Sequence, residues 1–275
     1  MENTQAGLTG FQIKVFALIF MTFDHIHYML TGIIDVPIAF TMIGRLAAPL
    51  FFFALATGMH HTRSRKKYVL RLYIGAVIVS LLNAFFDRTF PDPSGAVLMG
   101  NIFATMFLVG IYIIIGSHFK SAIHEKRTGH ALLWGLAALV PLALSTLPLA
   151  LMNVLPQNLY WVLMLVDSFL PSVFLVEGGI AWIILGLGLY LCNEKKWRVA
   201  IFYLFFCLLL FVLPNFLNGV SFLESIQWMM IFALPLMLLY NGKKGRGMKY
   251  FFYIYYPAHI YALLFVAHAL HYFLS

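Results

Sequence analysis

The sequence is poor in charge, in cysteine and in the short motifs of common enzyme families. Only 10% of its 275 residues are charged while 62% are hydrophobic, which excludes a soluble domain. The two cysteines, Cys192 and Cys207, lie in or beside apolar stretches and indicate neither a disulfide framework nor a metal cluster. The histidine and cysteine spacings do not match a zinc site, so we expect no metal. A phosphate-binding glycine loop and a serine nucleophile elbow are also missing.

The chain also lacks a long polar linker and any alternation of apolar and polar residues with a period of two. The first absence argues against a second domain, and the second argues against a β-barrel. The sequence consists instead of apolar stretches of roughly 20 residues, the length that crosses about 30 Å of hydrocarbon. It therefore predicts an all-α, polytopic integral membrane helical bundle in which residues 1–275 form a single domain.

The lysines and arginines, which give the chain a net charge of +8, are concentrated in short clusters. The clusters occupy residues 63–71, 120–127, 195–198 and 243–249. Positive residues remain on the cytoplasmic side during membrane insertion, so this pattern predicts topology rather than a nucleic-acid partner. Placing all four clusters in the cytoplasm predicts a multi-pass protein with its N-terminus cytoplasmic and its C-terminus external.

About nine spans, within a range of eight to ten, satisfy this topology. They cover residues 11–32, 37–59, 68–86, 98–117, 130–152, 173–192, 199–217, 225–241 and 250–273. The apolar stretch 154–172 would invert every later cluster if it also crossed the bilayer. Because Pro156, Asp167 and Pro171 interrupt it, we interpret this stretch as a re-entrant or interfacial segment.

The first span contains two adjacent ionisable residues, Asp24 and His25. A bare charge in hydrocarbon costs several kcal/mol, so such residues usually face the protein interior and mark a functional site. They lie roughly 20 Å along the span, and Arg45 lies roughly 12 Å down the second span from the opposite face, at a similar depth. We therefore expect a buried ion pair between Asp24 and Arg45, with Gly44 allowing the two helices to approach closely.

His25 lies one position, or about 100°, around the helix from Asp24, so another residue is expected to orient its ring. Lys14 precedes His25 by eleven residues, which places both side chains on one face, about 16 Å apart. A cation near the cytoplasm and an imidazole deeper on the same face suit a long donor with a phosphate head, such as acyl-CoA. The alternative is that Lys14 only extends its ammonium group to the interface.

A second candidate for binding phosphate is the basic loop after the second span. Its candidate ligands are Arg63, Arg65, Lys66 and Arg71. Guanidinium groups match phosphate oxygens well, although such clusters also serve only to set topology.

Other polar residues in the spans are candidates for lining the same site. They are Tyr28, Asn101, Glu177 and His259. Pro257 is expected to kink the last span next to His259, which lies at mid-membrane depth and either approaches His25 or simply packs there.

Several segments together resemble the TraX family, named for a conjugation protein that N-acetylates a pilin subunit. They are FDHIHYM at 23–29, IGRLAAPLFFFALATGMHHTRSRKKYVLRL at 43–72, NIFAT at 101–105 and LYNGKKGRGMKYFFYIYYPAHI at 239–260. This family is similar to transmembrane acyltransferases that use a membrane histidine, a basic residue eleven positions before it and a cytoplasmic Arg-rich motif. Lys14 and His25 match the first pattern, and residues 63–66 match the second with Lys66 where arginine is usual.

The resemblance implies an acetyltransferase of the bacterial cytoplasmic (inner) membrane that takes its acetyl group from cytoplasmic acetyl-CoA. The acceptor would be an amine or hydroxyl of a pilin-like peptide, a glycan or a lipid head group. In this hypothesis His25 is the general base or carries the acyl group, while Asp24 holds Arg45 near the developing oxyanion. A proton-coupled transporter and a non-catalytic scaffold of a secretion or conjugation system are the alternatives.

Overall fold

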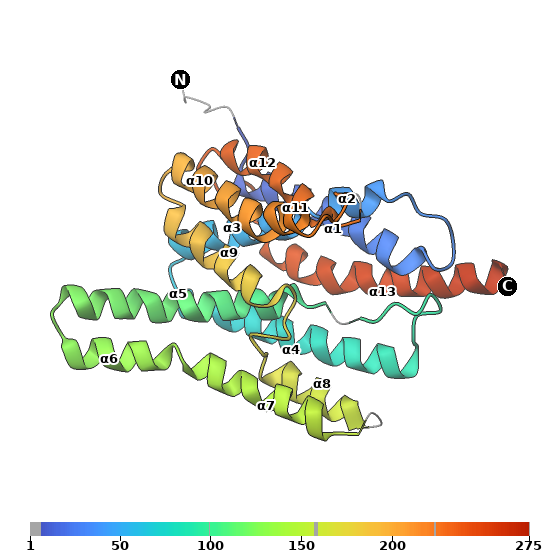
Figure 1. Ribbon diagram of the computed structural model, residues 1–275, viewed down its shortest axis with the longest axis horizontal. Coiled ribbons are helices and arrows are strands. Elements are labelled where there is room, and N and C mark those ends of the chain that lie inside the picture. Colours follow the sequence, from blue (N-terminus) through green and yellow to red (C-terminus); the bar gives the residue numbers. More distant parts are fainter. Residues whose placement is uncertain (1–6, 99, 157–158, 223, 275) are drawn as a thin grey trace. The chain divides into compact units, whose positions relative to one another are not determined.

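A computed structural model describes residues 7–98, 100–156, 159–222 and 224–274, without the side chain of Lys249 (Figure 1). The regular elements in this part of the chain are helices, and the β-type pairing is an isolated bridge between Leu8 and Tyr240. The predicted all-α helical membrane bundle is thus confirmed.

The chain divides into two units. Unit 1 consists of residues 1–57, 91–97 and 191–275, and unit 2 of residues 58–90 and 98–190. The sequence prediction of a single domain over residues 1–275 stays a prediction.

Unit 1 holds both ends of the chain. Its helices are α1 (Gly10–Leu30), α2 (Ala39–Gly44), most of α3 (Ala47–His61), α10 (Lys196–Cys207), the π-helix η2 (Leu208–Val212), α11 (Leu213–Leu217), the 3-10 helix η3 (Ile226–Ala233), α12 (Leu234–Leu238) and α13 (Lys249–Leu274). Unit 2 is built from α4 (Arg65–Thr89), α5 (Ile102–His124), α6 (Thr128–Ala137), α7 (Val140–Val154), α8 (Tyr160–Phe169) and most of α9 (Gly179–Cys192).

Seven helical segments among the described residues are long and apolar enough to cross a membrane. They correspond to seven of the nine predicted spans. The other two, 173–192 and 225–241, differ from the prediction because they form only the shorter apolar helices Gly179–Cys192 and Ile226–Leu238. In the stretch 154–172, α8 has 10 residues, about 15 Å of helix, and residues 157–158 lie outside the described residues.

Prolines explain the breaks inside the predicted spans. A proline lacks the N–H that would bond the carbonyl four residues earlier, and its ring crowds that carbonyl. Pro49 therefore interrupts the second span near Arg45, between α2 and α3. Pro141 has the same effect between α6 and α7. The first of these breaks positions an arginine at a helix end within the second apolar span.

Helices α1 and α13 pack side by side in the same direction (Figure 1). Near the start of α1, Phe11 contacts Phe252. Near its end, Leu30 shares a hydrophobic cluster with Ala267. Because both numbers increase together along the contact, the two helices are parallel.

Within each unit, two basic clusters lie at one end. In unit 1 the backbone N–H groups of Gly10 and Phe11 donate to the carbonyl oxygens of Lys243 and Lys244, at 2.8 and 3.0 Å. Nearby, Lys196 Nζ donates to the carbonyl of Leu238 at 2.7 Å. In unit 2, Arg65 at the start of α4 donates to Ser117 near the end of α5. If all four clusters face the cytoplasm, the two clusters of each unit must lie at the same end of that unit, as they do here.

Candidate active site

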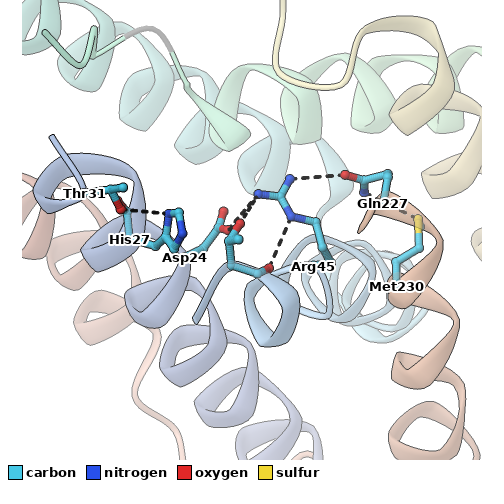
Figure 2. A network of polar contacts seen from close by, with 7 residues as sticks. Asp24, His27, Thr31, Arg45, Gln227 and Met230 are labelled. Atoms are coloured by element: carbon cyan, nitrogen blue, oxygen red, sulfur yellow. Dashed lines mark hydrogen bonds and ion pairs between the residues drawn. The ribbon is translucent and has the colours of Figure 1, made fainter. Parts of the chain in front are cut away.

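The ion pair predicted between the first two spans is present. Arg45 Nη2 lies 2.8 Å from Asp24 Oδ1, and the two side chains are 30% and 25% exposed (Figure 2). Asp24 comes from α1, and Arg45 is the C-cap residue that follows the last residue of α2. The break caused by Pro49 lets the arginine turn back toward α1, so two charges inside the spans compensate each other.

Two further polar side chains complete this network, and sequence reasoning did not select them as site residues. Thr41 Oγ1 donates to Asp24 Oδ1 at 2.7 Å and accepts from Arg45 Nη2 at 2.7 Å. Gln227 of η3 accepts from Arg45 Nη1 at 3.1 Å (Figure 2). Thr41 lies four residues before Arg45, one helical turn away, and this spacing was the available signal. With Nε also donating to the Thr41 carbonyl, all three guanidinium nitrogens have partners.

Gly44 allows α1 and α2 to approach as closely as this network requires. A Cβ atom added at Gly44 would overlap Cβ of Asp24 and would lie 2.6 Å from Oδ1 of the same side chain. The glycine predicted to permit close packing therefore lies directly against the acidic member of the ion pair.

His25 faces a different helix from its neighbour Asp24. Its Nδ1 lies 2.6 Å from Nε2 of His259 on α13, and the two rings are nearly coplanar, at 9°. The His259 ring is buried, and its Nδ1 bonds the carbonyl oxygen of Tyr255 at 2.9 Å. His259 thus bonds the His25 ring, which also has an edge contact with Tyr256. Asp24 bonds Arg45 instead.

Lys14 shares the α13-facing side of α1 with His25, as their spacing predicts. Its Nζ lies 5.4 Å from the centre of the Phe252 ring, one turn into α13. Thr22, between them in sequence, is hydrogen-bonded to the Tyr255 hydroxyl at 2.8 Å. One seam between α1 and α13 therefore carries a cation near its beginning and an imidazole pair further along.

The remaining candidate lining residues have other partners within their own units. Tyr28 is 54% exposed, and its hydroxyl donates to the carbonyl of Val97 in unit 1. Asn101 and Glu177 belong to unit 2. There Asn101 Nδ2 donates to Ser80 and to the Ala76 carbonyl, at 2.7 and 2.8 Å.

The basic loop also belongs to unit 2, and its members have different environments. Arg63 and Lys66 are exposed. Arg65 is half-buried, donates to Ser117 at 2.9 Å and to the Met59 carbonyl at 3.0 Å, and stacks over Tyr190. These bonds give Arg65 a structural role in joining the helices of unit 2. Arg71, also half-buried, lies over the ring of Tyr68.

Most of the chain is similar to known proteins. A family model described as TraX protein matches residues 9–267. The chain is also similar to a protein described as "Probable fimbrial assembly protein FimC, serogroup H1" from Dichelobacter nodosus, with 26% identity over 267 residues. The match covers 92% of this chain and 93% of that protein. No solved structure matches the chain.

Proposed function

The chain belongs to the TraX family, and from this premise we propose that it is a membrane-embedded acetyltransferase acting on a pilin-like acceptor. Its multi-pass helical character and its similarity to a fimbrial assembly protein support a pilin-related membrane protein. The single observation that carries the catalytic part is the histidine pair, in which His25 is held at 2.6 Å by His259 on the seam that also contains Lys14.

The proposed reaction is acetyl transfer from acetyl-CoA to an amine or hydroxyl of the acceptor. His25 removes a proton from the attacking nitrogen or oxygen as that atom forms a bond to the thioester carbonyl carbon. The C–S bond then breaks, and the CoA sulfur takes the proton from His25. The products are the acetylated acceptor and free CoA, and the histidine returns to its neutral form.

The other site residues have supporting roles in this proposal. Lys14 lies about 16 Å before His25 along α1, so a donor with its phosphates near the ammonium group would extend along the seam. Arg63 and Lys66, exposed in unit 2, are further proposed phosphate ligands, with Arg71 as a weaker one. Asp24 and Arg45 keep α1 and α2 together. The proposal assigns to the substrate the second N–H of Arg45 Nη1, whose first N–H donates to Gln227.

The proposal places the protein in the bacterial cytoplasmic membrane with acetyl-CoA entering from the cytoplasm. The N-terminal end of α1 and the basic clusters would face the cytoplasm, and the end of α13 the opposite side. A glycan or lipid head group would meet the same chemical requirement as a pilin amine, because each supplies a nucleophilic nitrogen or oxygen.

The test uses the purified protein in detergent with radiolabelled acetyl-CoA and a synthetic peptide with the N-terminal sequence of a pilin. We expect labelled peptide from the wild type and none above background from His25→Ala. His27→Ala is the matched control, because the His27 ring bonds Thr31 on its own helix, and it should retain transfer. Equal transfer by wild type and His25→Ala would remove His25 from the chemistry. Absence of acetyl-CoA binding to the wild type would refute the enzyme.

A further inference from the structure

The hydrogen bonds of His259 determine which of its ring nitrogens carries the proton. Its Nδ1 lies 2.9 Å from the carbonyl oxygen of Tyr255, which can only accept a hydrogen bond. His259 Nδ1 must therefore be the donor. In a neutral imidazole the other nitrogen is then an acceptor, so His259 Nε2 presents a lone pair.

This assignment fixes the tautomer of His25 in turn. The acceptor His259 Nε2 lies 2.6 Å from His25 Nδ1, so His25 Nδ1 must carry the proton. His25 Nε2 is then unprotonated. If His259 Nε2 instead donated to His25 Nδ1, both ring nitrogens of His259 would carry a proton and the ring would be charged. An extra charge inside a membrane span costs several kcal/mol.

The surroundings of His259 hold its ring in the orientation that this chain of bonds needs. Its side chain is 8% exposed and lies between Tyr255, with ring centres 5.2 Å apart, and Tyr256, at 5.9 Å. These contacts leave His259 little freedom to rotate away from His25.

We propose that His259 is a positioning residue that keeps His25 in the tautomer whose free, basic nitrogen is Nε2. This rests on the proposed role of His25 as general base, and it identifies the nitrogen that accepts the proton from the acceptor. When His25 becomes protonated during transfer, its Nδ1–H continues to donate to His259, so the ring keeps its orientation. A neutral imidazole thus performs the orienting task that a carboxylate performs in a serine protease triad.

Two substitutions of His259 separate its hydrogen bond from its packing. His259→Gln places an acceptor oxygen near the position of Nε2, whereas His259→Leu fills similar space without an acceptor. His27→Ala is the control, because it changes another histidine of α1 whose ring bonds Thr31 on its own helix.

The first measurement is nitrogen NMR of the histidine-labelled protein in detergent, which distinguishes protonated from unprotonated ring nitrogens and needs no turnover. In the wild type and in His27→Ala, His25 Nε2 should be unprotonated at neutral pH. In His259→Leu, the signal should show a proton on Nε2 in a large fraction of molecules. A wild-type His25 with its proton on Nε2 would overturn the proposal, whether or not the protein transfers acetyl groups.

The second measurement is steady-state acetyl transfer. His259→Leu should lower kcat by about 100-fold with KM for acetyl-CoA unchanged, and His259→Gln should recover most of the loss. His27→Ala should match the wild type. A His259→Leu protein as active as the wild type would refute the positioning role while leaving the proposed function intact. If the wild type transfers no acetyl group, the proposed function fails, and the NMR result alone decides the tautomer.

Discussion

The contact between Gly44 and Asp24 makes Gly44→Ala the sharpest test of how the first two spans pack. The new Cβ would overlap Cβ of Asp24 and would lie 2.6 Å from Oδ1 and 2.7 Å from Cγ. Rotation about χ1 of Asp24 can move Oδ1 and Cγ, but it cannot move Cβ, which the backbone of α1 fixes. The clash is therefore relieved only if α1 and α2 move apart.

Two effects contribute to the expected loss in the free energy of unfolding. Overpacking of a tight contact costs about 1–3 kcal/mol. Separation of the helices also weakens the Asp24–Arg45 pair, and loss of one partner of a fully buried pair costs about 3–5 kcal/mol. Because the two side chains remain 25% and 30% exposed, only part of the second amount applies. We expect the free energy of unfolding to fall by about 2–5 kcal/mol in total.

The assay is reversible unfolding of the purified protein in mixed detergent micelles, with Gly116→Ala as the matched control. Gly116 lies within α5, and a Cβ there would have nothing within 4 Å, so the change should stay within about 1 kcal/mol. In a protein that also carries Asp24→Asn and Arg45→Met, Gly44→Ala should cost only the packing part, about 1–3 kcal/mol. Equal unfolding of Gly44→Ala and Gly116→Ala would refute the close approach of α1 and α2.

Three further predictions address the donor site, unit 2 and the topology. Lys14→Met should raise KM for acetyl-CoA about tenfold with little change in kcat in steady-state assays, because the cation is proposed to contact the donor phosphates and not the reacting carbonyl. A fall in kcat alone would contradict this proposal. Arg65→Lys should destabilise the protein by about 1–3 kcal/mol in thermal unfolding, since lysine cannot reproduce both bonds of the guanidinium, whereas exposed Arg63→Lys should change stability by less than about 0.5 kcal/mol. Reporters fused before α1 and after α13 should lie on opposite sides of the membrane, because the helices are parallel, and reporters on one side would contradict that packing.

Much of the fold could be predicted because apolar length and charge clusters are strong signals in membrane proteins. The helical membrane bundle and the first, third, fourth and last long spans follow from runs of about 20 apolar residues. The sequence did not predict that 173–192 and 225–241 would form only short helices. Hydropathy measures how apolar a stretch is, but glycines at 178–179 and a 3-10 helix at Ile226–Ala233 shorten the regular helix without changing that property.

The candidate site was predictable where it depends on helical geometry. Depth along antiparallel spans paired Asp24 with Arg45, and an eleven-residue spacing placed Lys14 and His25 on one face. The third partner of Arg45, Gln227, could not be chosen from several polar residues in apolar stretches, because its place depends on how η3 packs. Asn101 and Glu177 belong to unit 2, and their predicted place in the lining of the site stays a prediction.

The hydrogen-bond partners of Asp24 and His25 bear on the choice between an acyltransferase and a proton-coupled transporter. A proton relay needs titratable groups that exchange protons with one another along a path. Among the described residues, Asp24 bonds Arg45 and Thr41, His25 bonds His259, and no hydrogen bond joins Asp24 to His25. Protonation of Asp24 would also leave the Arg45 charge without its counterion in a medium of low dielectric constant. This arrangement supports the proposed role of His25, in which it exchanges a proton with a bound substrate, over transfer of protons across the membrane.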